Sequence, residues 1–239
     1  MNPVPHSSWA KVYDLAYERT FGSLYRQLTE STLQAISRLY PKPARIVDFG
    51  AGTGRLSIPL ARAGHEVIAV DPCAEMLEQL LGKADGVEIA TAHCTMADFE
   101  TSTPADLALG VFTVLLYLLE EDDLRQSLTA ARRALKGGGG MLVDVASSAL
   151  FRGFEAGDDR LTRRVSISAS GENRFIYEED LTLANPDGSL SRFEDRFTIR
   201  LWKPEEVLAA SQASGFTMEN DLSDDFAGSG SRYFLLRAV

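Results

Sequence analysis

Hydrophobic positions in the first forty residues recur at intervals of three and four. They share one side of a helix and comprise Trp9, Val12, Leu15, Ala16, Leu24, Leu28, Leu33 and Ile36. This spacing predicts helical structure over residues 7–39. The segment PKP at 41–43 ends the pattern, because proline lacks a backbone donor and restricts the residue before it.

Between residues 45 and 146, short apolar runs alternate with helical patterns. The apolar runs predict strands at 45–49, 66–71, 87–92, 107–112 and 141–146. The patterns between them predict helices at 55–63, 74–81 and 121–135. Such alternation of strand and helix is typical of a parallel sheet with helices on both faces.

After residue 147 the hydrophobic period becomes two. RRVSISASG alternates apolar residues with serines, and two further alternating runs flank the turn NPDG, which predicts an antiparallel hairpin or small sheet. The last run separates two faces, one with Phe197, Ile199 and Leu201, the other with Arg196, Thr198, Arg200 and Trp202. KPEEVLAASQASGF then predicts a helix, and SRYFLLRAV predicts a final strand.

Composition and charge exclude some classes of function. The 239 residues are 45% hydrophobic and 24% charged, in the ordinary globular range. The net charge of -10 disfavours a nucleic acid partner, since such binding depends on neutralising phosphates. The sequence contains no apolar run of about 18 residues, so we expect no membrane span. The start MNPVPHSSW lacks the features of a secretory signal, so we expect a cytoplasmic protein.

Three glycines follow the first predicted strand. Gly50, Gly52 and Gly54 stand at the first strand-to-helix turn, where open parallel sheets bind their ligands. Glycine there permits positive φ and lets the backbone approach a ligand closely. A dinucleotide-binding G-x-G-x-x-G would need a glycine where Arg55 stands, which disfavours a dehydrogenase.

Two aspartates bracket this loop. Asp71 ends the second predicted strand, where its carboxylate can accept hydrogen bonds from both hydroxyls of a ribose. Asp48 lies inside the first strand, in an otherwise apolar segment. Because an unpaired buried carboxylate is costly, Asp48 needs backbone donors, water or a cationic ligand group. A ligand that carries an ammonium and a sulfonium would satisfy it.

These segments together resemble the class I S-adenosylmethionine-dependent methyltransferases. VDFGAGTG resembles their first motif, VIAVDPCAEML their acid-ended second strand, and LKGGGGMLVDV their fifth strand with the loop before it. VYDLAYERTFGSLY resembles the opening helices of the branch that methylates the nitrogen of amino sugars and amino acids. The resemblance covers residues 45–146 and resumes at 203–239.

The resemblance implies a Rossmann-like α/β fold, doubly wound, with a mostly parallel seven-stranded sheet and an antiparallel β insertion after the fifth strand. The expected division is an N-terminal helical cap at 1–43, the cofactor-binding domain at 44–146 and 203–239, and the insertion at 147–202. The insertion is expected to serve as a lid, an acceptor site or a contact with a second copy, because exposed strands can pair.

The resemblance also implies which residues bind S-adenosylmethionine. The loop would hold the methionine part, Asp48 its amino group and Asp71 its ribose. Pro72 and Met76 would border the adenine, with Thr95 and Met96 at its edge. The full set of expected cofactor contacts is Tyr13, Tyr25, Asp48, Gly50, Ala51, Gly52, Gly54, Asp71, Pro72, Met76, Thr95, Met96 and Phe112. Thr95 stands where the family often has an acid.

For the methyl acceptor, the resemblance indicates the segment after the fourth strand. Thr113 and Tyr117 are the expected contacts there, with Arg200 and Trp202 from the insertion. Arg196, Arg200 and Trp202 can equally form a solvated surface or one that contacts a second subunit. Tyr13 and Tyr25 can equally be packing residues of an amphipathic helix.

The sequence therefore favours an enzyme that methylates a small molecule, on nitrogen rather than oxygen. The alternatives are an NAD(P)-dependent oxidoreductase and a non-catalytic regulatory protein that binds the same cofactor. No catalytic base is assigned: His6 lies in a segment expected to be loose, His65 at a remote turn and His93 at the end of a strand. No metal is expected, since Cys73 and Cys94 have no ligand spacing.

Overall fold

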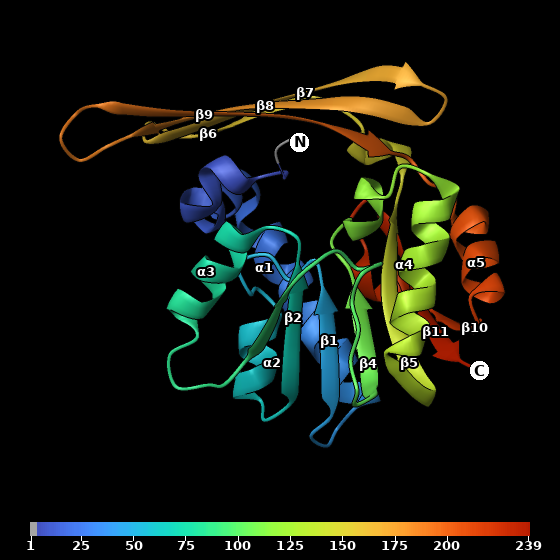
Figure 1. Ribbon diagram of the computed structural model, residues 1–239. Helices are drawn as coiled ribbons and strands as arrows, with labels where there is room; N and C mark the ends of the chain where they lie inside the picture. The colour runs from blue at the N-terminus through green and yellow to red at the C-terminus, as the bar shows by residue number, and fades with distance from the viewer. Residues whose placement is uncertain (1–3) are drawn as a thin grey trace.

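The protein consists of two β-sheets with helices packed around the larger one (Figure 1). The structure is a computed structural model and describes residues 4–239. The larger sheet forms the body of the molecule, and the smaller one lies across its top as a separate layer. Of the helices described, none is long and apolar enough to cross a membrane.

The larger sheet has seven strands. In spatial order they are β10 (Phe216–Asp221), β11 (Ser231–Ala238), β5 (Leu135–Ala146), β4 (Ala105–Gly110), β1 (Arg45–Phe49), β2 (Glu66–Asp71) and β3 (Ala90–His93). The strands from β5 to β3 are parallel, while β11 runs antiparallel to both of its neighbours. The chain proceeds outward from β1 to β3 and returns to β4 on the other side of β1. This reversal of strand order places a ligand crevice beside the carboxyl end of β1.

Helices cover both faces of this sheet. They are α1 (Tyr13–Leu39), α2 (Ser57–Arg62), α3 (Ala74–Lys83), α4 (Glu121–Arg133) and α5 (Pro204–Ala213). Alternate residues of β1 face opposite layers: Val47 packs in the core under α4 and α5, and Ile46 packs in the core with α1, α2 and α3. Burial of both faces explains why the predicted strands read as continuous apolar runs.

The N-terminal helical region follows the prediction. A short 3-10 helix, η1 (Ser7–Val12), leads into α1, which bends at Gly22, where φ is 47°. The bend separates an aromatic first part, under the smaller sheet, from a second part that packs against the larger sheet through Ala35 and Ile36.

The smaller sheet is the predicted antiparallel insertion. It consists of β6 (Phe154–Gly157), β7 (Leu161–Gly171), β8 (Arg174–Ala184) and β9 (Leu190–Arg200), in that order. Its inner face packs Leu161 and Leu181 against Trp9 and Ala16 of the N-terminal region. The other face points away from the rest of the molecule (Figure 1).

The predicted fold class is confirmed, and some element limits differ. β3 begins at Ala90 instead of residue 87, because residues 85–87 form a turn. In this turn Gly86 has φ 78°, and the backbone N–H of Val87 donates to the carbonyl of Ala84. The helix predicted from 55 begins at Ser57. The seventh strand is β10, whose residues after Phe216 are exposed and therefore give no apolar run.

Candidate active site

The glycine loop turns tightly over the end of β2. The backbone N–H groups of Gly50 and Ala51 both donate to the carbonyl of Val70, at 2.8 and 3.1 Å. Gly50 has φ +69°, and a Cβ there would lie 2.5 Å from Cγ2 of Val114. Both the backbone angle and the close neighbour therefore require glycine at this position.

Asp71 fixes the same loop from the second strand. One carboxylate oxygen accepts the N–H of Gly52 and the other accepts the N–H of Cys73, each at 2.8 Å. Asp71 is buried, and burial raises the pKa of its carboxyl group. Each oxygen keeps a further lone pair, so the carboxylate can accept two more hydrogen bonds.

Asp48 is buried at the base of the loop. The hydroxyl of Ser57 donates to its Oδ2 at 2.6 Å. Burial nevertheless raises the pKa of Asp48 to about 6. A cationic partner would lower this pKa again, because an opposite charge favours the ionised form.

A small cavity of about 70 Å³ opens beside this loop. Its lining residues are Tyr13, Tyr25, Asp48, Gly50, Ala51, Gly52, Thr53, Arg55, Leu56, Val111 and Phe112. The guanidinium carbon of Arg55 lies 3.2 Å from the centre of the Phe112 ring and 4.3 Å from that of Tyr25. Arg55 thus lies against both aromatic rings in the lining of the cavity.

The aromatic wall of the cavity has a strained backbone. Phe112 and Thr113, which follow β4 after Val111, both have left-handed conformations, with φ of 64° and 68°. The N–H of Thr113 donates to Oδ1 of Asp144 at 2.8 Å, and Asp144 is buried on the neighbouring β5. Residues held in such conformations cluster at functional sites, where the surroundings enforce them.

The N-terminal helix is anchored to the glycine loop. The hydroxyl of Thr53 donates to a carboxylate oxygen of Asp14 at 2.5 Å. This contact sits beside Tyr13, which lines the cavity together with Tyr25 from the same helix. The first part of α1 therefore closes over the loop.

The structure brings together seven of the residues expected to contact the cofactor. These are Tyr13, Tyr25, Asp48, Gly50, Ala51, Gly52 and Phe112. Gly54 lies outside the cavity lining, and a Cβ on it would meet the Leu80 side chain at 2.7 Å and that of Ile58 at 3.0 Å. Gly54 therefore serves the packing of α3 and α2 behind the loop.

The residues expected near adenine extend from the ends of β2 and β3. Pro72 is exposed, and its carbonyl lies 3.0 Å from Nε2 of His93. Met76 is buried with Ala10. Thr95 is exposed and donates to Asp98 at 2.6 Å, while Met96 is buried in the core.

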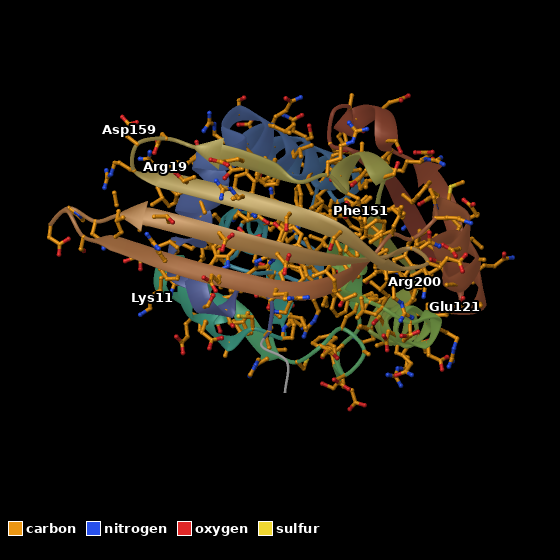
Figure 2. The ribbon with its side chains drawn as sticks, turned by 90° about the horizontal axis from the view of Figure 1, so that it is seen from above. Lys11, Arg19, Glu121, Phe151, Asp159 and Arg200 are labelled. Carbon is orange, nitrogen blue, oxygen red and sulfur yellow. The ribbon has the colours of Figure 1, made fainter. Side chains whose placement is uncertain are left out.

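The acceptor residues expected from the insertion lie elsewhere. Trp202 is 2% exposed, and its indole N–H donates to the carbonyls of Leu115 and Leu118 at 3.1 and 3.0 Å. Arg200 stacks on Trp202 and donates to the carbonyl of Leu119. Seen from above, Arg200 lies beside Glu121 at one end of the smaller sheet (Figure 2). Neither side chain lines the cavity.

The alternation predicts that Arg196 and Trp202 share one face of the sheet, and the structure shows that they do not. β9 ends at Arg200, so the alternation does not extend to Trp202. Arg196 is exposed on the outer face of the sheet, where it pairs with Glu178 at 3.1 Å.

His6, expected in a loose segment, is instead buried under the smaller sheet. It is 8% exposed, and its Nε2 lies 2.9 Å from the hydroxyl of Tyr117, a residue expected at the acceptor. Arg163, Glu179 and Asp195 of the smaller sheet surround it. Sequence reasoning missed this cluster, although the period of two places Glu179 and Asp195 on the face that carries Tyr177 and Phe197.

Comparison with known proteins identifies the central region. Residues 46–139 match the family described as methyltransferase domain. A protein of Geobacillus sp. (strain WCH70) named as a methyltransferase is 31% identical over 145 residues, which cover 60% of this chain and 58% of that protein. The malonyl-[acyl-carrier protein] O-methyltransferase of Pseudescherichia vulneris is 30% identical over 144 residues, 59% of this chain and 52% of that protein. The chain thus spans little more than half the length of these relatives.

A solved structure extends the similarity of fold to the whole chain. The sugar N-methyltransferase KedS8 of Streptoalloteichus sp. superposes with a TM-score of 0.78 at 20% identity, covering 100% of this chain and 97% of that one. The match over residues 46–139 agrees with the family expected from the glycine loop and Asp71 and disfavours the oxidoreductase alternative. Residues 46–139 thus match a methyltransferase domain, and the chain as a whole shares the fold of KedS8.

Proposed function

We propose that the protein transfers the methyl group of S-adenosylmethionine to a nitrogen atom of a small molecule. The observation that carries this proposal is the cavity in which Asp48 and the glycine loop meet the rings of Tyr13, Tyr25 and Phe112. A transferase that works by direct displacement mainly has to align its reactants in a dry site. The aromatic rings and the smaller sheet above them would exclude water.

The residues at the loop fit the functional groups of the cofactor. Asp71 would hold the ribose, since each of its oxygens has a lone pair left after bonding to the loop. Asp48 would hold the amino group, which supplies the cation that a buried carboxylate needs. Gly50 and Gly52 would let the methionine part lie against the backbone.

Arg55 is a further candidate for cofactor binding. The guanidinium of Arg55 lies against the Phe112 and Tyr25 rings in the lining of this cavity. We expect the bound cofactor to displace Arg55 from the Phe112 ring. Its guanidinium would then be free to pair with the cofactor's carboxylate, which guanidinium groups recognise well.

The remaining expected contacts stay part of the proposal. Pro72, Met76, Thr95 and Met96 would border the adenine, and Thr113 with Tyr117 would face the acceptor. The division into a cap at 1–43, a cofactor-binding domain and an insertion at 147–202 is proposed on the same basis. Pairing of the insertion's outer face with a second copy is proposed as well.

Nitrogen is the favoured acceptor atom on chemical grounds. The bound cofactor supplies a methyl group on a positively charged sulfur. A neutral amine attacks without a strong base, whereas an alcohol must lose its proton, and neither histidine nor lysine is among the residues that line the cavity. KedS8, whose fold matches along the whole chain, is a sugar N-methyltransferase by name.

The experiment is a turnover assay with matched acceptors. The purified protein is incubated with S-adenosylmethionine and either a panel of primary and secondary amines or the corresponding alcohols, and S-adenosylhomocysteine is quantified. We expect amine-dependent product and background levels with the alcohols. Binding of S-adenosylhomocysteine without turnover on any acceptor would instead support the non-catalytic alternative.

A further inference from the structure

The inner face of the smaller sheet carries two carboxylates directly opposite each other. Glu179 on β8 and Asp195 on β9 are register partners, so their side chains project from the same face. Both side chains are almost fully buried, at 1% and 6% exposure. Like charges in directly opposed positions destabilise a sheet, and burial increases that cost. The arrangement therefore calls for a positive charge between the strands.

The residues that the structure describes supply only part of that charge. The Nε of Arg163 donates to Oε1 of Glu179, while its guanidinium lies 4.4 Å from the centre of the Tyr17 ring. His6 contributes no charge at neutral pH, because burial and the nearby Arg163 lower its pKa to about 3. Within residues 4–239, one cation thus faces two carboxylates, and Asp195 accepts the backbone N–H groups of His6 and Arg196.

Unpaired polar atoms converge at the same place. Among residues 4–239, the buried atoms without a hydrogen-bond partner include Oε2 of Glu179 and Nδ1 of His6, and also the donor atoms Nη1 of Arg163 and Nε1 of Trp9. Nδ1 of His6 lies 3.9 Å from Oε2 of Glu179 and 3.6 Å from Oδ2 of Asp195. With the tautomer that places the imidazole proton on Nε2, toward Tyr117, the three atoms are all acceptors. An alkylammonium group offers the three donors that would match them.

This cluster adjoins the cavity at the glycine loop. The ring of Tyr13, which lines the cavity, lies 5.7 Å from the His6 ring. On the other side, the hydroxyl of Tyr117 reaches Nε2 of His6, and Tyr117 is 40% exposed. Tyr117 therefore connects the cluster to the surface, and Tyr13 connects it to the methyl-transfer site.

We propose that Glu179, Asp195 and His6 bind an ammonium group of the methyl acceptor that is separate from the neutral nitrogen receiving the methyl group, and that the acceptor is accordingly a cationic amine. Apolar parts of such an acceptor would contact the stacked rings of Tyr177 and Phe197, whose centres are 4.7 Å apart on the same face. This inference rests on the proposed function, because it identifies the ligand of the cluster as the methyl acceptor.

The test compares two probes of the same shape. Benzylammonium and benzyl alcohol differ in charge at one end and share the ring that would meet Tyr177 and Phe197. Each is titrated calorimetrically into the full-length protein in the presence of S-adenosylhomocysteine. We expect benzylammonium to bind at least tenfold more tightly than benzyl alcohol. Equal affinity for the two probes would overturn the proposal without any need for a variant.

Variants then locate the binding site. Asp195→Asn leaves the Arg163–Glu179 pair intact and should weaken benzylammonium at least tenfold, as should Glu179→Gln. Glu178→Gln, on the outer face of the same strand and paired with Arg196, is the matched control and should have no effect. Unchanged benzylammonium binding in Asp195→Asn would contradict the assignment.

Binding of S-adenosylhomocysteine separates this proposal from the proposed function. Each variant should keep that affinity unchanged, which also shows that it is folded. Charge-selective binding that depends on Asp195, in a protein that never produces S-adenosylhomocysteine, would support the site and refute the methyl transfer. Amine-dependent turnover that Asp195→Asn leaves unaffected would refute the site and preserve the methyl transfer.

Discussion

The carboxylate of Asp71 and the backbone N–H of Gly52 are joined by a hydrogen bond of 2.8 Å. The contact ties the end of β2 to the loop that follows β1, so the acid proposed to hold the ribose also sets the position of the backbone proposed to hold the methionine part. The two proposed contacts with the cofactor are therefore coupled through one side chain.

Substitution of Gly52 by alanine has two expected effects that can be measured separately: backbone strain and steric exclusion of the cofactor. Gly52 lies in the cavity with φ +53°, and the nearest atom to an added Cβ is 4.0 Å away. Gly52→Ala should destabilise the protein by about 1–2 kcal/mol, the cost of a left-handed alanine, and reduce S-adenosylhomocysteine affinity at least tenfold. The control is Gly64→Ala, at φ +90° with no atom within 4 Å, which should be strained but bind normally. Equal binding by the two variants would show that Gly52 does not touch the cofactor.

Arg55 gives a prediction about the cofactor's carboxylate. Arg55→Ala should weaken S-adenosylhomocysteine about tenfold or more, since a charge-assisted hydrogen bond contributes about 1.5–3 kcal/mol. It should leave 5′-methylthioadenosine unaffected, because that ligand lacks the amino and carboxylate groups. Calorimetry with the two ligands measures the difference. Tighter binding of both ligands to the variant would show that Arg55 only obstructs the cavity.

The parts of the site that lie close in sequence could be predicted, and the parts that depend on tertiary packing could not. Asp48, Gly50 and Asp71 act through the ends of adjacent parallel strands, which the alternation of strand and helix already brings together. The alternation predicts Trp202 on a polar face because it extends the strand to residue 202, whereas β9 ends at Arg200.

The cluster around His6 could not be predicted from the sequence either, because it joins segments that lie far apart in the chain. His6 meets Asp195, 189 positions away, through a hydrogen bond from its backbone N–H. Periodicity can place Glu179 and Asp195 on one face, but it contains no information about which other segment covers that face. The N-terminal region does so through packing of Trp9 and Ala16 against the sheet.

Asp144 predicts a pH dependence of stability. Burial raises its folded-state pKa to about 6, above the unfolded value near 3.9, so the folded state binds more protons between these values. The Asp144 contribution therefore falls as pH rises from about 4 to 6. Asp144→Asn keeps an oxygen for the N–H of Thr113 and lacks this titration, so the variant should gain up to about 2–3 kcal/mol relative to the wild type across this range.

Urea unfolding at pH 4, 5, 6 and 7 measures this difference. Asp122→Asn on the exposed start of α4 is the control and should run parallel to the wild type. A constant difference between Asp144→Asn and the wild type across the range would show that Asp144 has an ordinary pKa.

Substitution of Trp202 is expected to lower the stability of the protein without weakening its binding of the acceptor. Trp202→Phe removes the donor shared by two carbonyls, at Leu115 and Leu118, and should lower the free energy of unfolding by about 1–3 kcal/mol. Affinity for benzylammonium should stay unchanged, since Trp202 lies in the core of the larger sheet. Loss of benzylammonium binding in a variant of normal stability would show that Trp202 belongs to the acceptor site.

The most direct measurement is calorimetric titration of the purified protein with S-adenosylmethionine, S-adenosylhomocysteine and NAD, repeated with Asp71→Ala. Both adenosyl ligands should bind the wild type, NAD should give no response, and the substitution should weaken both at least tenfold, because it removes the carboxylate proposed to hold the ribose and frees the N–H of Gly52. Glu75→Gln, an exposed carboxylate on the next helix, should behave as the wild type. Binding of NAD in preference to the adenosyl ligands, or affinities that Asp71→Ala leaves unchanged, would contradict the proposed site.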